Sequence, residues 1–156
     1  MEKDVIVAEI KNYFLLQEFV SRNVYNTWGE RAWAFLDEKM LETLLVIRRD
    51  ILKVGLVMND WKFGGKHQQR GLRENTCQIV KQKTDEGTMY ISSHCLGKAF
   101  DVVCSKMSAD EMRNKIIENA YLLPYSIRIE SEKSAPTWLH VDMLVSDFSK
   151  KITKFS

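Results

Sequence analysis

Residues 92–101 (SSHCLGKAFD) and residues 137–142 (TWLHVD) hold two of the three histidines of this chain. Together they supply His94, Asp101 and His140, two imidazoles and one carboxylate that can serve as metal ligands. A structural zinc site is usually closed by four Cys or His ligands, whereas a catalytic site has three protein ligands and a water. These segments therefore predict a metal site of the second kind, and the fold must bring them together.

Period-2 alternation explains how the three side chains can meet. Residues 98–104 (KAFDVVC) form a short β-branched and aromatic run, which is typical of a strand that presents Asp101 on one face. In residues 138–144 (WLHVDML), apolar side chains alternate with polar ones, so a second strand presents His140 opposite its apolar face. Gly97 accepts backbone angles that other residues avoid and can fold the preceding loop over the strand start.

The two motifs, S-x-H-x-x-G-x-A-x-D and W-x-H-x-D, resemble those of the zinc D-Ala-D-Ala carboxypeptidase family. That family shares its fold with the Hedgehog signalling domain and includes phage endolysins that cut peptidoglycan peptides. The matching positions are Ser92, His94, Gly97, Ala99 and Asp101 in the first motif and Trp138, His140 and Asp142 in the second. The resemblance implies that His94, Asp101 and His140 are ligands of Zn²⁺.

The resemblance extends toward the amino terminus. Residues 14–20 (FLLQEFV) and 41–48 resemble the helical lead-in that is common in phage members of the family. Residues 59–73 resemble a glycine-containing segment that ends, here, in G-L-R. In the family the arginine of this ending commonly holds a substrate carboxylate. The resemblance implies that role for Arg73, with Arg70 as its alternative.

The position of the catalytic glutamate departs from the commonest family pattern. Many relatives carry a glutamate three residues before the second histidine, but Thr137 occupies that position here. Other relatives, including the Hedgehog-like branch, carry the glutamate at the end of the preceding strand. The resemblance therefore implies Glu130 as the catalytic base, with Glu132 as the alternative. Ser92 and Asp142 are candidates for orienting the ligands from outside the metal shell.

Structural roles are the alternatives for several of these residues. An isolated strand histidine is more often a hydrogen-bonded structural residue than a ligand. The paired motifs reverse that expectation, because a buried acid and two histidines are costly to bring together unless something compensates the charge. His67, in a glycine-containing polar loop, is expected to be solvated or to line the substrate rim. Trp138 is expected to pack, and a surface ion pair is the alternative for Arg73.

Composition favours one soluble globular domain over residues 1–156. Hydrophobic residues make up 45% and charged residues 28% of the 156, which is enough for an adequate core. A net charge of +2 with interspersed acids and bases does not favour nucleic acid as a partner. The three cysteines are odd in number and lack C-x-x-C spacing, so neither a disulfide framework nor a Cys-type zinc site is predicted.

The sequence predicts no export signal and no membrane segment. The first residues lead into a short apolar patch that Glu9 and Lys11 interrupt, and no apolar stretch approaches the length of a membrane span. We therefore expect the chain to be cytoplasmic as synthesised. A peptidoglycan enzyme of this kind is expected to reach the cell wall through a phage lysis pathway or within the phage particle. The oligomeric state is not predicted.

Two helices and several strands are expected elsewhere. Apolar residues recur at helical spacing over residues 37–52, with acids near the start and arginines near the end. Ser108 and Glu111 form a capping-box pattern that opens a second helix, which is expected to pack on the sheet. Residues 55–61 and 88–91 are expected to be strands. Residues 73–86 fit either a helix or a loop.

These expectations combine into an α+β, Hedgehog/DD-peptidase-like fold: a helical amino-terminal part followed by a small, mainly antiparallel sheet that carries zinc. The expected function is a zinc metallopeptidase that cleaves peptidoglycan stem peptides beside a D-amino acid, as an endolysin or a D,D- or L,D-type peptidase. The alternative is a catalytically silent, zinc-stabilised binding module or phage structural component.

Overall fold

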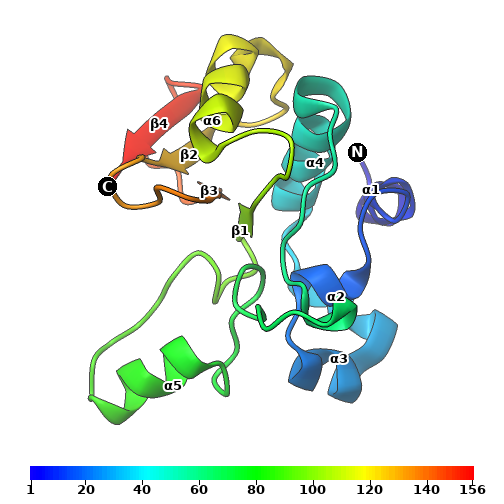
Figure 1. The fold of residues 1–156 in the computed structure, drawn as a ribbon, viewed down its shortest axis with the longest axis vertical. Helices are drawn as coiled ribbons and strands as arrows, with labels where there is room; N and C mark the ends of the chain where they lie inside the picture. The colour runs from blue at the N-terminus through cyan, green and yellow to red at the C-terminus, as the bar shows by residue number, and fades with distance from the viewer.

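A four-stranded sheet and six α-helices form the fold in a computed structural model that describes all 156 residues (Figure 1). Four helices come first: α1 (Lys3–Ile10), α2 (Leu16–Phe19), α3 (Arg22–Trp28) and α4 (Glu38–Val46). They are followed by α5 (Gln78–Asp85), β1 (Ala99–Val102), α6 (Ala109–Glu118), β2 (Ile127–Glu130), β3 (Leu139–Asp142) and β4 (Ile152–Phe155). Short 3₁₀ segments occupy Gly29–Phe35, Trp61–Phe63 and Ala120–Leu122. The expected α+β class is confirmed, and no helix has both the length and the apolar character to cross a bilayer.

The strands lie in the order β1-β3-β2-β4. β3 pairs antiparallel with β1 and with β2, whereas β4 runs parallel to β2, so the sheet is mixed. The two strands expected at the motifs are present as β1 and β3, the preceding strand expected to end at Glu130 is β2, and β4 is an addition to them. In the β1–β3 ladder, Asp101 lies directly opposite His140.

The apolar face of the sheet packs under α6, as expected for the helix with the capping box (Figure 1). Leu139 and Val141 are fully buried there, in one core cluster with Met112 and Ile116 of α6. The hydrophobic contribution of each such side chain is about 1.5–3 kcal/mol. Burial of this face fixes which side of β3 carries His140, because successive strand residues point to opposite sides.

Both expected helices are present, the second begins at its predicted capping box, and Asp37 caps the first. The Asp37 carboxylate accepts a hydrogen bond from the backbone N–H of Met40 at 3.0 Å, and α4 continues as a π-helical turn over Ile47–Leu52. The Ser108 hydroxyl accepts from the Glu111 backbone N–H at 3.2 Å, and the Glu111 carboxylate accepts from the Ser108 N–H at 2.7 Å. These caps satisfy N–H groups that would otherwise lack partners at the helix starts.

The strand predictions for residues 55–61 and 88–91 are wrong. Within residues 55–61 only Val57 pairs, as an isolated antiparallel bridge with Val103, and a 3₁₀ turn begins at Trp61. Residues 88–91 form no strand, and Met89 and Ile91 are 87% and 70% exposed. Apolar alternation there does not produce a strand because no neighbouring strand supplies hydrogen-bond partners. Residues 73–86 contain both alternatives, a loop followed by α5.

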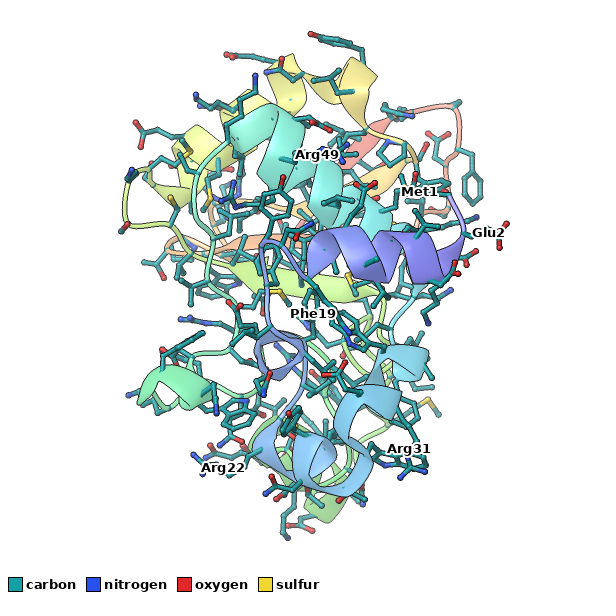
Figure 2. The ribbon with its side chains drawn as sticks, turned by 90° about the vertical axis from the view of Figure 1, so that its right-hand side faces the viewer. Met1, Glu2, Phe19, Arg22, Arg31 and Arg49 are labelled. Atoms are coloured by element: carbon teal, nitrogen blue, oxygen red, sulfur yellow. The ribbon has the colours of Figure 1, made fainter.

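Phe19 connects the amino-terminal helices to the segment that leads into the site (Figure 2). Its ring is fully buried and lies 5.7 Å from the ring of Phe14 and 5.2 Å from that of Trp33, measured between centroids. Its carbonyl accepts the backbone N–H of Leu72 at 2.7 Å. A Cβ added to Gly71 would lie 2.1 Å from that carbonyl oxygen, so only glycine allows this approach.

Gly97 makes a similar close contact between the His94 loop and the start of α4. It has a φ of +66°, and its carbonyl accepts the backbone N–H of Asp37 at 3.0 Å. A Cβ at this position would lie 2.1 Å from the carbonyl oxygen of Phe35. The turn expected at Gly97 is therefore present, and it also positions the loop against the helical part.

We expect Gly97→Ala to destabilise the protein more than Gly87→Ala. Gly87 has nearly the same φ, +69°, but nothing lies within 4 Å of an added Cβ. Both variants carry the left-handed backbone cost of about 1–2 kcal/mol, and Gly97→Ala adds an overpacking cost of about 1–3 kcal/mol. Urea unfolding at 25 °C measures both. Equal losses of unfolding free energy in the two variants would contradict the close approach.

Candidate metal centre

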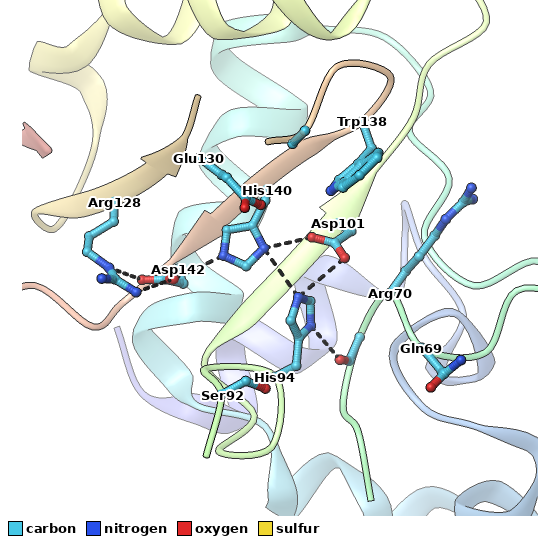
Figure 3. Close-up of polar contacts among 12 residues, drawn as sticks. Gln69, Arg70, Ser92, His94, Asp101, Arg128, Glu130, Trp138, His140 and Asp142 are labelled. Atoms are coloured by element: carbon cyan, nitrogen blue, oxygen red, sulfur yellow. Dashed lines mark hydrogen bonds and ion pairs between the residues drawn. The ribbon is translucent and has the colours of Figure 1, made fainter. Parts of the chain in front are cut away.

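Three side chains from separate segments converge in the cluster shown in Figure 3: His94 from the loop before β1, Asp101 from β1 and His140 from β3. All three are buried, and their potential ligand atoms lie within 4.8 Å of one another. His94 Nε2 is 3.2 Å from His140 Nδ1, which in turn is 2.7 Å from Asp101 Oδ1. The structure thus brings together the three residues predicted as ligands, and they can hold a metal ion.

Local backbone contacts hold the His94 loop in place. The His94 carbonyl accepts the backbone N–H groups of Arg73 at 3.1 Å and Gly97 at 3.2 Å. The backbone N–H of Asp101 donates to the carbonyl of Arg70 at 2.8 Å. Residues 70–73 are anchored to Phe19 of the helical part by the Leu72 N–H, and they therefore hold two of the three ligands in place.

The hydrogen-bond partners of the two imidazoles identify the nitrogens that face the centre. His94 Nδ1 lies 2.8 Å from the Gly71 carbonyl oxygen, which can only accept, so this nitrogen carries the proton. His140 Nε2 lies 3.0 Å from Asp142 Oδ2, a carboxylate oxygen that likewise accepts. The remaining nitrogens, His94 Nε2 and His140 Nδ1, face each other and Asp101, and each carries a lone pair when its imidazole is neutral.

This convergence of acceptors fits a cation. Two lone pairs and a carboxylate repel one another unless a positive charge lies between them. For metal–nitrogen bonds of about 2.0–2.1 Å, two ligands of a tetrahedral shell lie roughly 3.3 Å apart, close to the 3.2 Å between the two nitrogens, whereas the 2.7 Å between His140 Nδ1 and Asp101 Oδ1 is a hydrogen-bond distance. The oriented outer partners of both imidazoles are also typical of metal-binding histidines.

The charges around His140 are arranged to balance a cation. Burial alone lowers the pKa of His140, but hydrogen bonds to Asp101 and Asp142 outweigh it and raise the pKa to about 9. Burial alone raises the pKa of Asp101, but hydrogen bonds from His140 and His94 hold it well below its usual range. The pKa of Asp142 is lowered in the same way, against burial, by His140 and Arg128. Both carboxylates are therefore anionic, and a bound metal ion takes the place of a proton on His140.

Asp142 is itself held by Arg128, a residue that lies outside both motifs. The guanidinium donates to both carboxylate oxygens at 2.8 Å and 2.8 Å, in a forked geometry. The ring of Phe155, from β4, lies 4.2 Å from the Arg128 guanidinium carbon and 5.7 Å from the His140 ring. A strand that was not predicted thus completes the surroundings of His140.

Ser92 makes no hydrogen bond to a ligand. Its hydroxyl accepts the backbone N–H of Cys95 at 3.3 Å, within the turn that carries His94. Ser92 lines the same cavity as the three ligands, but its contact is with the loop and not with an imidazole. The outer partner of His94 is the Gly71 carbonyl, which no side-chain motif reveals.

The two candidate glutamates lie in different surroundings. The β2–β3 register pairs Arg128 with Asp142 and Ile129 with Val141, so one residue beyond the last pair Glu130 lies opposite His140, on the same face as Arg128. Glu130 lines a cavity of about 380 Å³ together with His94, Asp101 and His140. Glu132 is exposed, and its pKa is lowered by its own backbone hydrogen bond and then by the positive charge of Lys154.

Buried Arg113 of α6 fixes the connection between β2 and β3 from behind. Its guanidinium donates to the carbonyl oxygens of Glu130 at 3.0 Å and Trp138 at 2.8 Å, and also to that of Ala135. Asp110 balances its charge at 2.7 Å. The backbone of Glu130 and Trp138 is therefore held by a helix on the opposite side of the sheet.

Arg73 lies beside the metal ligands and is already partly engaged. It donates to the Gln69 carbonyl at 2.7 Å, the Tyr90 hydroxyl at 2.9 Å and Asp101 Oδ2 at 3.4 Å. Since a guanidinium has five N–H groups, two remain free. The Arg70 side chain donates to the Met58 carbonyl at 3.1 Å and has no contact with the ligands. Of the two arginines, Arg73 is the one that touches the cluster.

Two cavities open at this cluster. The one of about 380 Å³ contains the ligands and Glu130, and a second of about 560 Å³ contains Arg70 and His67. Arg73, Asp101 and Trp138 line both. His67 is therefore placed on a cavity wall, as expected for a rim residue, and Trp138 stands between the two spaces.

Comparison with known proteins gives no match for this chain, whether to a protein-family model, to a curated protein or to a solved structure. Support for a function therefore comes from the residues of the cluster and their contacts.

We expect the purified protein to bind about one zinc ion per chain, because three ligands and a water complete a tetrahedral shell. His94→Ala and His140→Ala should each lose stoichiometric zinc after dialysis, as measured by elemental analysis. His67→Ala, which removes the third histidine, is the matched control and should retain the metal. Full zinc occupancy in the His94→Ala/His140→Ala double variant would reject the site.

Asp142→Asn should weaken zinc binding by about 10–100-fold, because the amide cannot fix the charge and tautomer of His140 as the carboxylate does. Competition with a chromogenic chelator measures the affinity. Asp147→Asn, a partly exposed acid whose carboxylate contacts only Ser149 and Lys150, is the control and should leave it unchanged. If the affinities of both variants equal that of the wild type, Asp142 does not orient His140.

Proposed function

We propose that this chain is a zinc metallopeptidase that hydrolyses peptide bonds in peptidoglycan stem peptides. The observation that carries the proposal is the buried group of His94, Asp101 and His140, which lines a cavity together with Glu130. A three-ligand metal set beside a carboxylate, at an open cavity, is the arrangement that metal-assisted hydrolysis requires.

Zinc is the ion we assign, because two imidazoles and one carboxylate are donors that zinc accepts in tetrahedral catalytic sites. Three protein ligands leave one coordination position for water or substrate. When bound, zinc lowers the pKa of that water and polarises the carbonyl of the scissile bond. Asp142 and the Gly71 carbonyl hold the two imidazoles in the orientation that ligation needs.

Glu130 is our assignment for the group that moves the proton. Its position opposite His140 supports a role at the reacting centre, where it takes a proton from the attacking water and delivers it to the leaving amine nitrogen. Glu132 remains the alternative base, but it is exposed and does not line this cavity. Its position favours a solvent-facing role.

Arg73 is our assignment for binding a substrate carboxylate near the metal. Its two free N–H groups and its position between the two cavities support this role. The Gln69 carbonyl and the Tyr90 hydroxyl fix the plane of the guanidinium before substrate arrives. A lysine could not reproduce this forked, planar donor.

The substrate class rests on the resemblance of the two motifs to the zinc D-Ala-D-Ala carboxypeptidase and Hedgehog-fold peptidases. We propose cleavage beside a D-amino acid, by an endolysin-like enzyme that reaches the wall through a phage lysis pathway or within the phage particle. The register of Asp101 with His140 supports the resemblance, because it lets both motifs contribute to one centre.

A catalytically silent, metal-stabilised binding module is the second candidate. Thr137, at the position where many relatives of that family carry the catalytic glutamate, is the observation that favours it. Thr137 is exposed and lines the larger cavity, so it supplies no carboxylate to the metal centre. Incubation of the zinc-loaded protein with purified peptidoglycan, followed by mass spectrometry of new termini, distinguishes the two candidates. New termini would establish the peptidase, and their absence would favour the binding module.

Glu130→Gln should retain zinc and fold but lose hydrolysis, because an amide cannot accept the proton from the attacking water. General acid–base catalysis contributes roughly 10²–10⁴-fold, so kcat should fall by about that factor. Release of peptide termini measures activity, and elemental analysis and thermal melting report metal and fold.

Glu132→Gln is the matched control and should remain active. Full activity in Glu130→Gln with loss in Glu132→Gln would move the base to Glu132. Full activity in both variants would show that neither carboxylate takes the proton.

A further inference from the structure

The larger cavity, of about 560 Å³, adjoins the metal centre on the side away from Arg128 and Glu130 (Figure 3). Its lining includes Lys66, Gln68, Gln69 and Arg70, and it meets the smaller cavity at Asp101. None of the assignments for the metal centre uses these four side chains. Their chemistry indicates what the cavity binds.

Two glutamines on this wall present only hydrogen-bond donors. Gln68 Oε1 accepts the backbone N–H of Arg22 at 2.9 Å, and Gln69 Oε1 accepts that of Ile79 at 2.8 Å. Because a backbone N–H can only donate, these contacts identify the oxygen of each amide. Each NH₂ group is left without a protein acceptor, and both residues line the cavity.

The charges on the same wall are positive and unpaired. Lys66 and Arg70 have no carboxylate within 4.0 Å, and Arg70 uses only Nη1, in its bond to the Met58 carbonyl. Asp101 is the only acid in the lining, and it is occupied by His94, His140 and Arg73. The start of α5, at Gln78, adds the positive end of a helix dipole.

We propose that this cavity binds a carboxylate-bearing residue of the peptide substrate, on one side of the scissile bond. A carboxylate accepts from a guanidinium and from amide NH₂ groups, and it balances the charges of Lys66 and Arg70. This carboxylate is separate from the one assigned to Arg73, because it lies among Gln68, Gln69 and Arg70. The inference rests on the proposed peptidase function and adds a preference for acidic peptides.

The volume and position of the cavity support a side-chain subsite. About 560 Å³ exceeds what one carboxylate needs and accommodates the residue that carries it. Trp138 and Asp101 border both cavities, so a peptide that crosses the metal centre continues directly into this space. Gln68, Gln69 and Arg70 are partly buried, which strengthens their hydrogen bonds relative to bulk water, whereas Lys66 is exposed and contributes its charge from the rim.

The test uses synthetic stem-peptide analogues that contain one D-amino acid and differ only in a single Glu or Gln, placed at each position in turn. Binding is measured by calorimetry to zinc-loaded Glu130→Gln protein, so that no turnover intervenes. Arg70→Gln/Lys66→Gln in the same background removes the two charges. Arg31→Gln/Lys62→Gln, two exposed residues outside both cavities, removes equal charge as the control.

At one position the Glu peptide should bind roughly tenfold more tightly than the Gln peptide. This preference should fall below about twofold in Arg70→Gln/Lys66→Gln and persist in the control. Equal binding of Glu and Gln peptides at every position, or a preference that survives in Arg70→Gln/Lys66→Gln, would overturn the proposal.

Hydrolysis by the wild-type protein separates this inference from the proposed function. A preference for Glu peptides that depends on Arg70 and Lys66, without cleavage of any peptide, would leave the subsite standing and reject the peptidase. Cleavage without any Glu preference would support the peptidase and reject the subsite.

Discussion

The antiparallel pairing of β1 with β3 is the constraint on which the site depends, because it sets Asp101 directly opposite His140. A slip of one residue would turn His140 and Asp142 toward the core and Leu139 and Val141 toward the cavity. The burial of the apolar face under α6 opposes such a slip. Hydrophobic packing on one side of a single strand thus fixes the position of the polar chemistry on the other.

The polar side of that strand is stable only as a connected set of charges. His140 lies between two carboxylates, and Asp142 in turn lies between His140 and Arg128. Burial alone would disfavour every one of these charged groups, so each needs its neighbour. Removal of one member leaves a buried charge without a partner. This dependence explains why residues from β1, β2, β3 and β4 surround one imidazole.

Sequence patterns predicted the helix starts and strands that depend on interactions between neighbouring residues. The helix that starts at Asp37, the cap at Ser108 and the alternation in residues 98–104 and 138–144 depend on neighbouring residues only, and the structure confirms them. The contact between Phe155 and Arg128 and the Gly71 carbonyl behind His94 depend on residues far apart in the chain, which no local pattern reveals. Residues 88–91 failed as a strand for the same reason, because a strand also needs a partner.

Arg113 also determines when the cleft becomes ordered. The segment between β2 and β3 is largely irregular, yet its carbonyl groups at Glu130, Ala135 and Trp138 converge on one buried guanidinium. Segments of this kind usually lose conformational freedom when a ligand arrives, which weakens binding. Here the loss of entropy occurs during folding, so the wall formed by Glu130 and Trp138 is preorganised for whatever molecule enters.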